Sequence, residues 1–324
     1  EPTVDLTGRP IKTVLGHPGE WSLVSDDNGI AKLARWRRGK LVEIEVESRR
    51  MFDPDELPLA PESVGRFMAI DEPVEWLVED VLPAGQPALL AGASKVCKTA
   101  IALDLAVSLA SGTPFLGRWA VPEPSVVLML TTEASRSRIQ SRIRAIVADP
   151  ARGISLDSLG DRLELQRLAP KIANRAHLEA LVAHLTTSIE QNRCRHGLLI
   201  VDPAYASLGG GKQPVNTASV VEVGQLLVEF SSELIAAGVV PMLLHHSTKT
   251  AARERSGVSK SFASLEDAAG AGYAEWCGSW LLPSRREKFE HDGRHLLNLA
   301  MGTREGTGGE FVAELVERSP TGGE

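Results

Sequence analysis

The sequence predicts an α/β protein with a mostly parallel central sheet that is flanked by helices. From about residue 70, near-continuous apolar runs of strand length alternate with helical runs, as in parallel sheets covered on both faces. A phosphate-loop-like segment at 92–99 joins one such strand to one such helix. Polar residues directly follow several of the apolar runs, and ligands gather at the carboxyl ends of parallel strands.

The first 50 residues predict a separate, small β-rich segment. Residues 21–25 and 41–46 alternate apolar and polar side chains, as half-buried strands do, and Asp27-Asn28-Gly29 between them is a turn signal. Basic residues surround Trp36. They are either a nucleic-acid patch with an aromatic ring for base stacking or a charged strand edge that resists aggregation, and we favour the second interpretation.

A linker rich in Pro, Asp and Glu follows, and we assign residues 51–69 to it. We expect the main domain to span residues 70–318 and to be followed by a short tail at 319–324. The apolar fraction of 43% and the charged fraction of 24% are those of an ordinary globular protein.

The most informative segment is Gly92-Ala93-Ser94-Lys95-Val96-Cys97-Lys98-Thr99. It matches the phosphate-binding pattern G-x-x-x-x-G-K-[ST], with Cys97 in place of the second glycine. Backbone N–H groups of such a loop, continuing into the helix at Ala100, point at phosphate oxygens. Lys98 is then expected to reach the β- and γ-phosphates of ATP, and Thr99 to bind Mg²⁺. The alternative is a strand–helix turn that binds nothing, and Lys95 and the downstream motifs argue against it.

The remaining elements follow from the spacing of apolar residues. Ile101, Leu105 and Leu109 share one face of a predicted helix, and Asp292-Gly293 is a hairpin signal near the end of the chain. In chain order we expect helix 99–111, strand 126–130, an arginine-rich amphipathic helix, strand 163–165, helix 174–191, strand 198–201, helix 217–237, strand 239–244 and strands 279–284 and 296–301.

Two carboxylates follow predicted strands. Asp202 has the form of a Walker B residue that holds Mg²⁺ beside Thr99; the alternative is an aspartate that caps a loop. Glu133 is the candidate general base that orients the attacking water; the alternative is an N-cap or first-turn acid of the next, arginine-rich helix, stabilised by the helix dipole.

His245 and His246 end another strand and must point in opposite directions. One of them is expected to sense the γ-phosphate, and His246 is preferred. The segment 248–260 has no apolar periodicity and carries four basic residues: Lys249, Arg253, Arg255 and Lys260. It is either a contact for nucleic-acid phosphates or a solvated surface loop, and both interpretations stay open.

Composition limits the kinds of partner and cellular setting that we expect for this protein. A net charge of −7 excludes a uniformly basic coat for nucleic acid, so such binding requires local patches. The three cysteines are far apart and lack metal-ligand spacing, which favours a reducing, cytoplasmic setting. No apolar run approaches the length of a membrane span.

These motifs, in this order, resemble the RecA-like ATPases of the hexameric helicase branch, closest to plasmid RepA-type helicases and related AAA family ATPases. The resemblance covers residues 70–318. It implies a homo-oligomeric ring, such as a hexamer. The ring binds ATP between its subunits and acts on DNA. The resemblance also implies that Glu133 is catalytic, that His245 or His246 is the sensor, and that Lys212 and the 248–260 segment lie in the central channel.

In the same family, an arginine from one subunit completes the nucleotide site of its neighbour. Arg304 resembles that residue, although Gly302 stands where the family has a lysine, and Arg285 and Arg286 compete with it. The expected function is therefore Mg²⁺-dependent ATP hydrolysis coupled to DNA binding, unwinding or remodelling. The alternatives are a slow ATP-dependent switch and a DNA-binding scaffold of the same fold.

Overall fold

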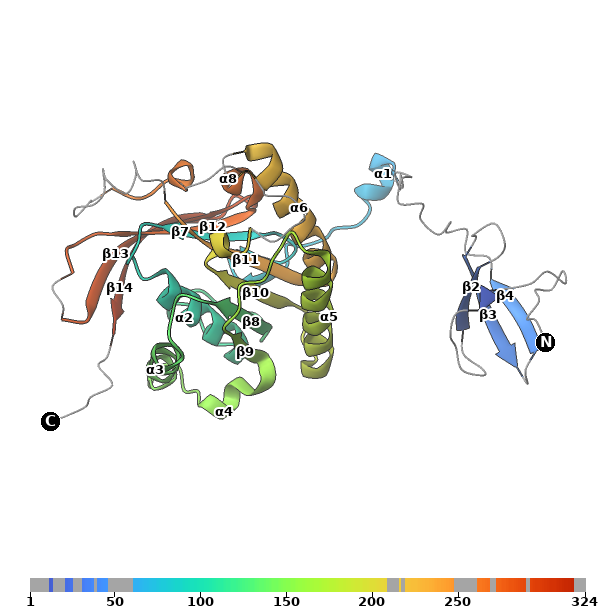
Figure 1. Cartoon of the computed structure of the whole chain (residues 1–324), viewed down its shortest axis with the longest axis horizontal. Coiled ribbons are helices and arrows are strands. Elements are labelled where there is room, and N and C mark those ends of the chain that lie inside the picture. Colours follow the sequence, from blue (N-terminus) through green and yellow to red (C-terminus); the bar gives the residue numbers. More distant parts are fainter. Residues whose placement is uncertain are drawn as a thin grey trace. The chain divides into compact units, whose positions relative to one another are not determined.

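The computed structural model describes four strands within residues 12–45 and then residues 61–208, 216, 219–247, 261–268, 272–289 and 292–317. The chain divides into two compact units, Glu1–Glu72 and Pro73–Glu324. The colours of Figure 1 follow the chain through both units.

The first unit contains a four-stranded antiparallel sheet in the order β1-β2-β3-β4. Its strands are β1 (Lys12–Thr13), β2 (Trp21–Ser25), β3 (Ala31–Arg37) and β4 (Lys40–Glu45). The two predicted strands are present, but β3 lies between them and pairs with both. Of the basic stretch around Trp36, Arg35 and Arg37 lie in the central strand β3, which differs from the expected sheet edge, whereas Lys40 begins the edge strand β4. A short helix, α1 (Val64–Phe67), lies in the stretch predicted as a linker.

The second unit carries all remaining elements. In chain order they are β5 (Trp76–Val78), β6 (Leu82–Pro83), β7 (Ala88–Gly92), α2 (Lys98–Ser111), β8 (Val126–Thr131), α3 (Arg136–Val147), α4 (Leu156–Leu159), η1 (Gly160–Arg162), β9 (Leu163–Gln166), α5 (Arg175–Asn192), β10 (Gly197–Asp202), η2 (Ala204–Ala206), α6 (Val220–Ala236), β11 (Val239–His246), η3 (Leu265–Asp267), α8 (Tyr273–Trp276), β12 (Ser279–Arg285), β13 (Arg294–Thr303) and β14 (Gly308–Val316).

Eight of these strands form one sheet in the order β14-β13-β12-β7-β11-β10-β8-β9. The strands from β12 across to β9 run parallel, whereas β13 and β14 add an antiparallel extension. The predicted fold class, α/β with a mostly parallel sheet flanked by helices, is confirmed. Because β7 lies between β11 and β12, the loop that follows it emerges between two parallel neighbours and not at an edge strand.

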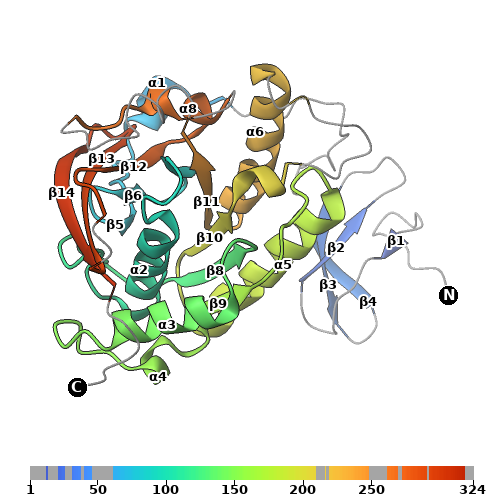
Figure 2. The same cartoon turned by 60° about the vertical axis from the view of Figure 1, so that its left-hand side comes forward.

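Alternate residues of each central strand enter two separate cores. Leu90, for example, belongs to the core beneath α2, α3 and α4, while its neighbour Leu89 belongs to the core beneath α5, α6 and α8. Figure 2 shows α2 and α3 on one side of the strands and α5 and α6 on the other. Burial on both faces explains why these strands are near-continuous apolar runs.

The C-terminal extension differs from the prediction in one respect. The strands at 279–284 and 296–301 are present as β12 and β13, but β14 was missed. It pairs with β13 over its whole length and forms the edge strand on that side of the sheet. Its side chains alternate between half-buried and exposed, as period-two patterning requires. Gly293 lies next to the start of β13, and the connection from β12 is longer than a two-residue hairpin.

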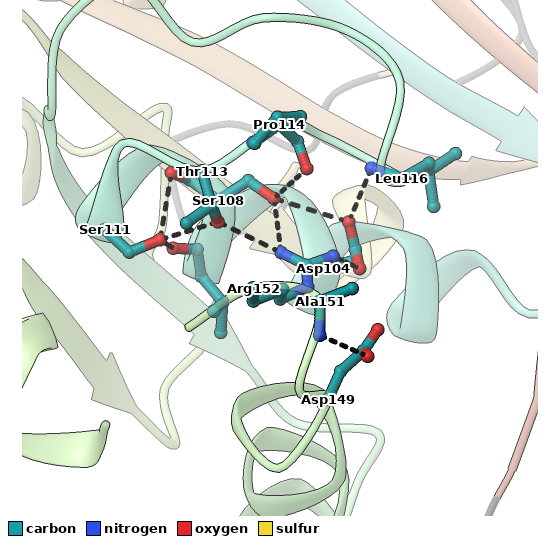
Figure 3. A network of polar contacts seen from close by, with 10 residues as sticks. Asp104, Ser108, Ser111, Thr113, Pro114, Leu116, Asp149, Ala151 and Arg152 are labelled. Atoms are coloured by element: carbon teal, nitrogen blue, oxygen red, sulfur yellow. Dashed lines mark hydrogen bonds and ion pairs between the residues drawn. The ribbon is translucent and has the colours of Figure 1, made fainter. Parts of the chain in front are cut away.

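A polar network fixes the segment after α3 against α2 (Figure 3). The Arg152 guanidinium forms an ion pair with the Asp104 carboxylate, and both side chains are largely buried. Arg152 Nη1 also donates to the Ser108 hydroxyl at 2.9 Å and to the Thr113 hydroxyl at 3.3 Å. The Asp104 carboxylate accepts from the backbone N–H of Leu116 at 2.9 Å. The network therefore ties the segment after α3 to α2, the helix that begins at Lys98.

Candidate nucleotide-binding site

The phosphate loop joins β7 to α2 through residues 93–97. Gly92 is required by space, because a Cβ there would lie 2.6 Å from the carbonyl oxygen of Pro283. Lys95 and Cys97 both adopt left-handed backbone conformations, with φ of 63° and 64°. Such conformations cost about 1–2 kcal/mol for a residue that has a Cβ. The expectation that Cys97 occupies a position suited to glycine is confirmed at the level of the backbone.

The Lys98 side chain lies across the loop. Its Nζ donates to the carbonyl oxygens of Gly92 at 2.9 Å and Ala93 at 2.8 Å. Burial lowers the pKa of Lys98, and the nearby carboxylates of Glu133 and Asp202 oppose that shift. The charges of both acids that the sequence singles out therefore act on the ammonium group.

The first residues of α2 meet the end of β10. Thr99 Oγ1 donates to Asp202 Oδ2 at 2.9 Å, and Thr131 Oγ1, at the end of β8, donates to the same oxygen at 3.4 Å. Asp202 is buried, and this burial raises its pKa, whereas the hydrogen bond from Thr99 lowers it. Thr131 was not predicted as a site residue, although the sequence carries a signal for it, namely a polar residue at the end of an apolar strand.

This donor set fits Mg²⁺. A threonine hydroxyl and a carboxylate are hard oxygen ligands, and Mg²⁺ in proteins is held by one or two such groups together with phosphates and water. Among the described residues, no cluster of three His, Cys, Asp or Glu side chains has the arrangement of a metal site. The fit therefore requires the oxygens of a bound phosphate as additional ligands.

Glu133 follows β8 and is partly exposed at the same edge of the sheet. The N-cap of α3 is Ser135, whose hydroxyl accepts from the backbone N–H of Arg138 at 3.3 Å. Glu133 is therefore neither the N-cap nor a first-turn acid of α3, and that alternative role is wrong. Its Oε1 lies 3.9 Å from Nε2 of His246, which ends β11. Burial lowers the pKa of His246, Lys98 adds to this shift, and Glu133 opposes it.

The two adjacent histidines point in opposite directions, as their position in a strand requires. His246 lies beside Glu133. His245 is buried on the other side of the sheet, where its ring stacks on Tyr273 with centroids 4.1 Å apart and planes inclined by 18°. The structure therefore places His246 with the phosphate loop and His245 in the core beneath α6 and α8.

Arg304 lies at the amino-terminal ends of the parallel strands, whereas the phosphate loop lies at their carboxyl ends. It directly follows β13, whose last residue, Thr303, pairs with Ser279 at the start of β12. Its backbone N–H donates to the carbonyl of Gly278 at 2.8 Å, and its guanidinium contacts the carbonyl of Glu275. Within one chain, Arg304 is not part of the loop site.

The missing lysine of the family pattern has a steric explanation. Gly302 pairs with Trp280 on β12, and a Cβ at position 302 would lie 2.4 Å from the indole ring. Trp280 therefore occupies the space that any side chain at position 302 would need.

Arg285, which the sequence also suggested as the arginine that acts on a neighbouring subunit, contacts the phosphate loop of its own chain. Arg285, the last residue of β12, donates from Nη2 to the carbonyl oxygen of Lys95 at 2.7 Å. Its neighbour Arg286 donates instead to Asn298 Oδ1 at 3.0 Å. The contact between Arg285 and the loop could not be predicted, because the parallel alignment of β12 with β7 is not visible in the sequence.

The basic residues predicted to contact nucleic acid lie outside the described residues, namely Lys212, Lys249, Arg253, Arg255 and Lys260. No helix in the described part of the chain combines the length and apolar character needed to cross a membrane.

Comparisons with known proteins identify the family to which the chain belongs. No curated protein matches it. Among solved structures, a DnaB-like replicative helicase aligns with a TM-score of 0.48 and 12% identity, over 70% of this chain and 54% of the helicase. The chain therefore spans about half the length of that protein. A second solved structure, an isolated ATPase domain, aligns with a TM-score of 0.49 and 15% identity, over 70% of this chain and 80% of that domain. Residues 53–252, more than half of the 324 residues, match the AAA domain family, and the chain belongs to that family.

Proposed function

We propose that this protein binds Mg²⁺–ATP in the loop between β7 and α2 and hydrolyses it. The observation that carries the proposal is the convergence of Lys98, Thr99, Asp202, Glu133 and His246 at one edge of the sheet, with Thr99 hydrogen-bonded to Asp202 at 2.9 Å. Membership of the AAA domain family supports it.

Each side chain has a role in this mechanism. The backbone amides of residues 92–100 hold the phosphates, and Lys98 neutralises charge on the β- and γ-phosphates. Thr99 and Asp202 are placed to hold Mg²⁺, which supplies electrostatic stabilisation of the transferred phosphoryl group when it is bound. Glu133 accepts a proton from the attacking water. His246, beside Glu133, donates a hydrogen bond toward the γ-phosphate and senses whether it is present.

We further propose that hydrolysis is coupled to DNA within a ring-shaped oligomer, as in RepA-type helicases. This step is supported by the order of the motifs along the sequence. Arg304 is a candidate for the arginine that acts on a neighbouring subunit, because it lies at the end of the parallel strands opposite to the loop of its own chain.

The experiment compares ATP hydrolysis with and without single-stranded DNA in the wild type and in Glu133→Gln. We expect DNA to stimulate turnover in the wild type, and the variant to bind ATP normally but to lose at least about 100-fold in turnover. DNA-independent hydrolysis would remove the coupling to DNA. Equal turnover in the two proteins would remove the assigned role of Glu133.

A slow ATP-dependent switch is the second candidate. The observation that favours it is the left-handed backbone of Cys97, at a position where glycine would be free of strain. A switch of this kind binds ATP tightly, turns it over slowly and shows no stimulation by DNA. Sizing the protein with and without Mg²⁺–ATP then reports whether nucleotide controls its assembly.

A further inference from the structure

Strand β12 supports the phosphate loop at two points. It runs parallel to β7, with Leu281 paired to Leu90, and continues past the end of that strand. The carbonyl of Pro283 packs against Gly92 at the start of the loop. Two residues further along β12, Arg285 Nη2 donates to the carbonyl of Lys95 at 2.7 Å. The loop is therefore held at both its first glycine and its first left-handed residue.

The Arg285 side chain is itself held in place. Its Nη1 lies 3.3 Å from Nδ1 of His295, a buried residue of β13. Its guanidinium carbon lies 5.4 Å from the ring centroid of Phe289, and that ring stacks on His295 with centroids 4.4 Å apart. A guanidinium fixed by an imidazole and an aromatic ring loses little side-chain freedom when it binds the loop.

The loop needs such support more than a glycine-containing loop would. Lys95 and Cys97 both keep φ near +60° although both have a Cβ, so the backbone of each favours a return to right-handed or extended conformations. That return would rotate the amides of the loop away from the phosphates. Burial raises the pKa of the Cys97 thiol, and Arg285 opposes that shift more than any other charged group does, in keeping with its position against the loop.

We propose that Arg285 is a positioning residue that acts within its own chain: by holding the carbonyl of Lys95, it keeps this cysteine-containing loop in the shape that receives phosphates. The proposal rests on nucleotide binding at the loop, as proposed above. It assigns Arg285 a structural hold on the loop, in contrast to a role in completing the site of a neighbouring subunit.

The test measures the affinity for a fluorescent, non-hydrolysable ATP analogue with Mg²⁺ in the wild type and in Arg285→Ala. We expect the variant to bind about tenfold or more weakly, as is typical when a charge-assisted hydrogen bond is lost. Arg294→Ala is the matched control, because Arg294 forms an exposed ion pair with Glu314 on β13 and β14. The control should bind like the wild type.

A second comparison separates loop support from general stability. In a Cys97→Gly background, where the loop is less strained, Arg285→Ala should weaken binding by only a few-fold. An equal loss in both backgrounds would overturn the proposal. If Arg285→Ala does not fold, Arg285→Gln supplies the same comparison, because it shortens the side chain and removes its charge but keeps a donor.

A mixing experiment separates action within a chain from action between chains. Subunits carrying Arg285→Ala are mixed with subunits carrying Lys98→Ala, and ATP turnover is measured. If Arg285 supports its own loop, mixing gives no site an intact loop together with its arginine, and turnover stays at the level expected from the unmixed variants. Regained turnover would show that Arg285 acts on a neighbour, and would overturn the proposal. Absence of analogue binding by the wild type would overturn the proposed function, and this inference with it.

Discussion

The Thr99 hydroxyl donates a 2.9 Å hydrogen bond to Asp202, although 103 positions separate the two residues in the sequence. This contact joins the first turn of α2 to the end of β10. It brings together the two oxygen ligands that the sequence assigns to Mg²⁺ separately. Substitutions at this contact and at the residues around it have distinct expected effects on stability, binding and turnover.

Replacing Asp202 separates the stability of the fold from its function. Burial raises the pKa of Asp202, so the folded protein binds a proton there more tightly than the unfolded chain does. The contribution of Asp202 to the stability of the ligand-free fold is therefore fully present below its unfolded pKa and is lost as the pH rises through its folded pKa. Asp202→Asn removes the buried charge, and at pH 7 we expect a melting temperature equal to or above that of the wild type.

Binding of Mg²⁺–ATP should show the opposite dependence on pH, because the metal requires the carboxylate to be deprotonated. We expect affinity to fall on acidification at a higher pH than for an ordinary aspartate, and to be largely lost in Asp202→Asn at every pH. Calorimetry measures the melting temperature, and ligand titration on the same samples measures the affinity for Mg²⁺–ATP. A variant that melts well below the wild type at pH 7 would contradict the assigned effect of burial.

The adjacent histidines provide a matched pair of substitutions. His246→Ala should lower ATP turnover by about 10-fold to 100-fold with little effect on stability, because His246 lies beside Glu133 at the edge of the sheet. His245→Ala should destabilise the fold by about 1–3 kcal/mol, because it removes a buried ring stacked on Tyr273. Steady-state turnover and urea unfolding of the two variants distinguish these effects. The reverse pattern would exchange the two assignments.

Substitutions at Cys97 test the strain in the loop. Cys97→Gly should raise the unfolding free energy by up to about 1 kcal/mol and increase turnover, because glycine adopts positive φ without a penalty. Cys97→Ala is the control, since it removes the thiol and keeps the Cβ. If alanine increases turnover as much as glycine does, the thiol rather than the backbone limits the site.

The ion pair between Asp104 and Arg152 is predicted to be essential to stability. Both side chains are largely buried, so Asp104→Asn or Arg152→Ala leaves a charge without its partner and should cost about 3–5 kcal/mol. The double variant Asp104→Leu, Arg152→Met should recover much of that loss. Denaturant unfolding of the four proteins measures the loss in each variant. A double variant that loses as much as the two single variants together would show that the unpaired charge is not the cause of the loss.

The sequence predicted those parts of the structure that depend on local patterns. The burial of β8, β10 and β11 on both faces produces the apolar runs from which they were predicted, and the spacing of the loop motif located the left-handed backbone at Cys97. The opposite directions of His245 and His246 followed from strand geometry alone.

Features that depend on pairing between distant segments were missed. The sequence contains the alternation of β14, but half-exposed positions at the edge of a sheet produce a weak pattern. The contact between Arg285 and Lys95 depends on the register of β12 beside β7, which no local pattern encodes. The buried pair of Asp104 and Arg152 similarly joins two segments that are distant in the sequence.

The central claim is that the loop between β7 and α2 binds Mg²⁺–ATP. The most direct test is a calorimetric titration of Mg²⁺ and a non-hydrolysable ATP analogue into the wild type and into Lys98→Ala. We predict saturable one-to-one binding to the wild type, at least about tenfold weaker binding without Mg²⁺ and none in the variant. An absence of binding by the wild type at millimolar analogue, or equal binding by Lys98→Ala, would contradict the claim.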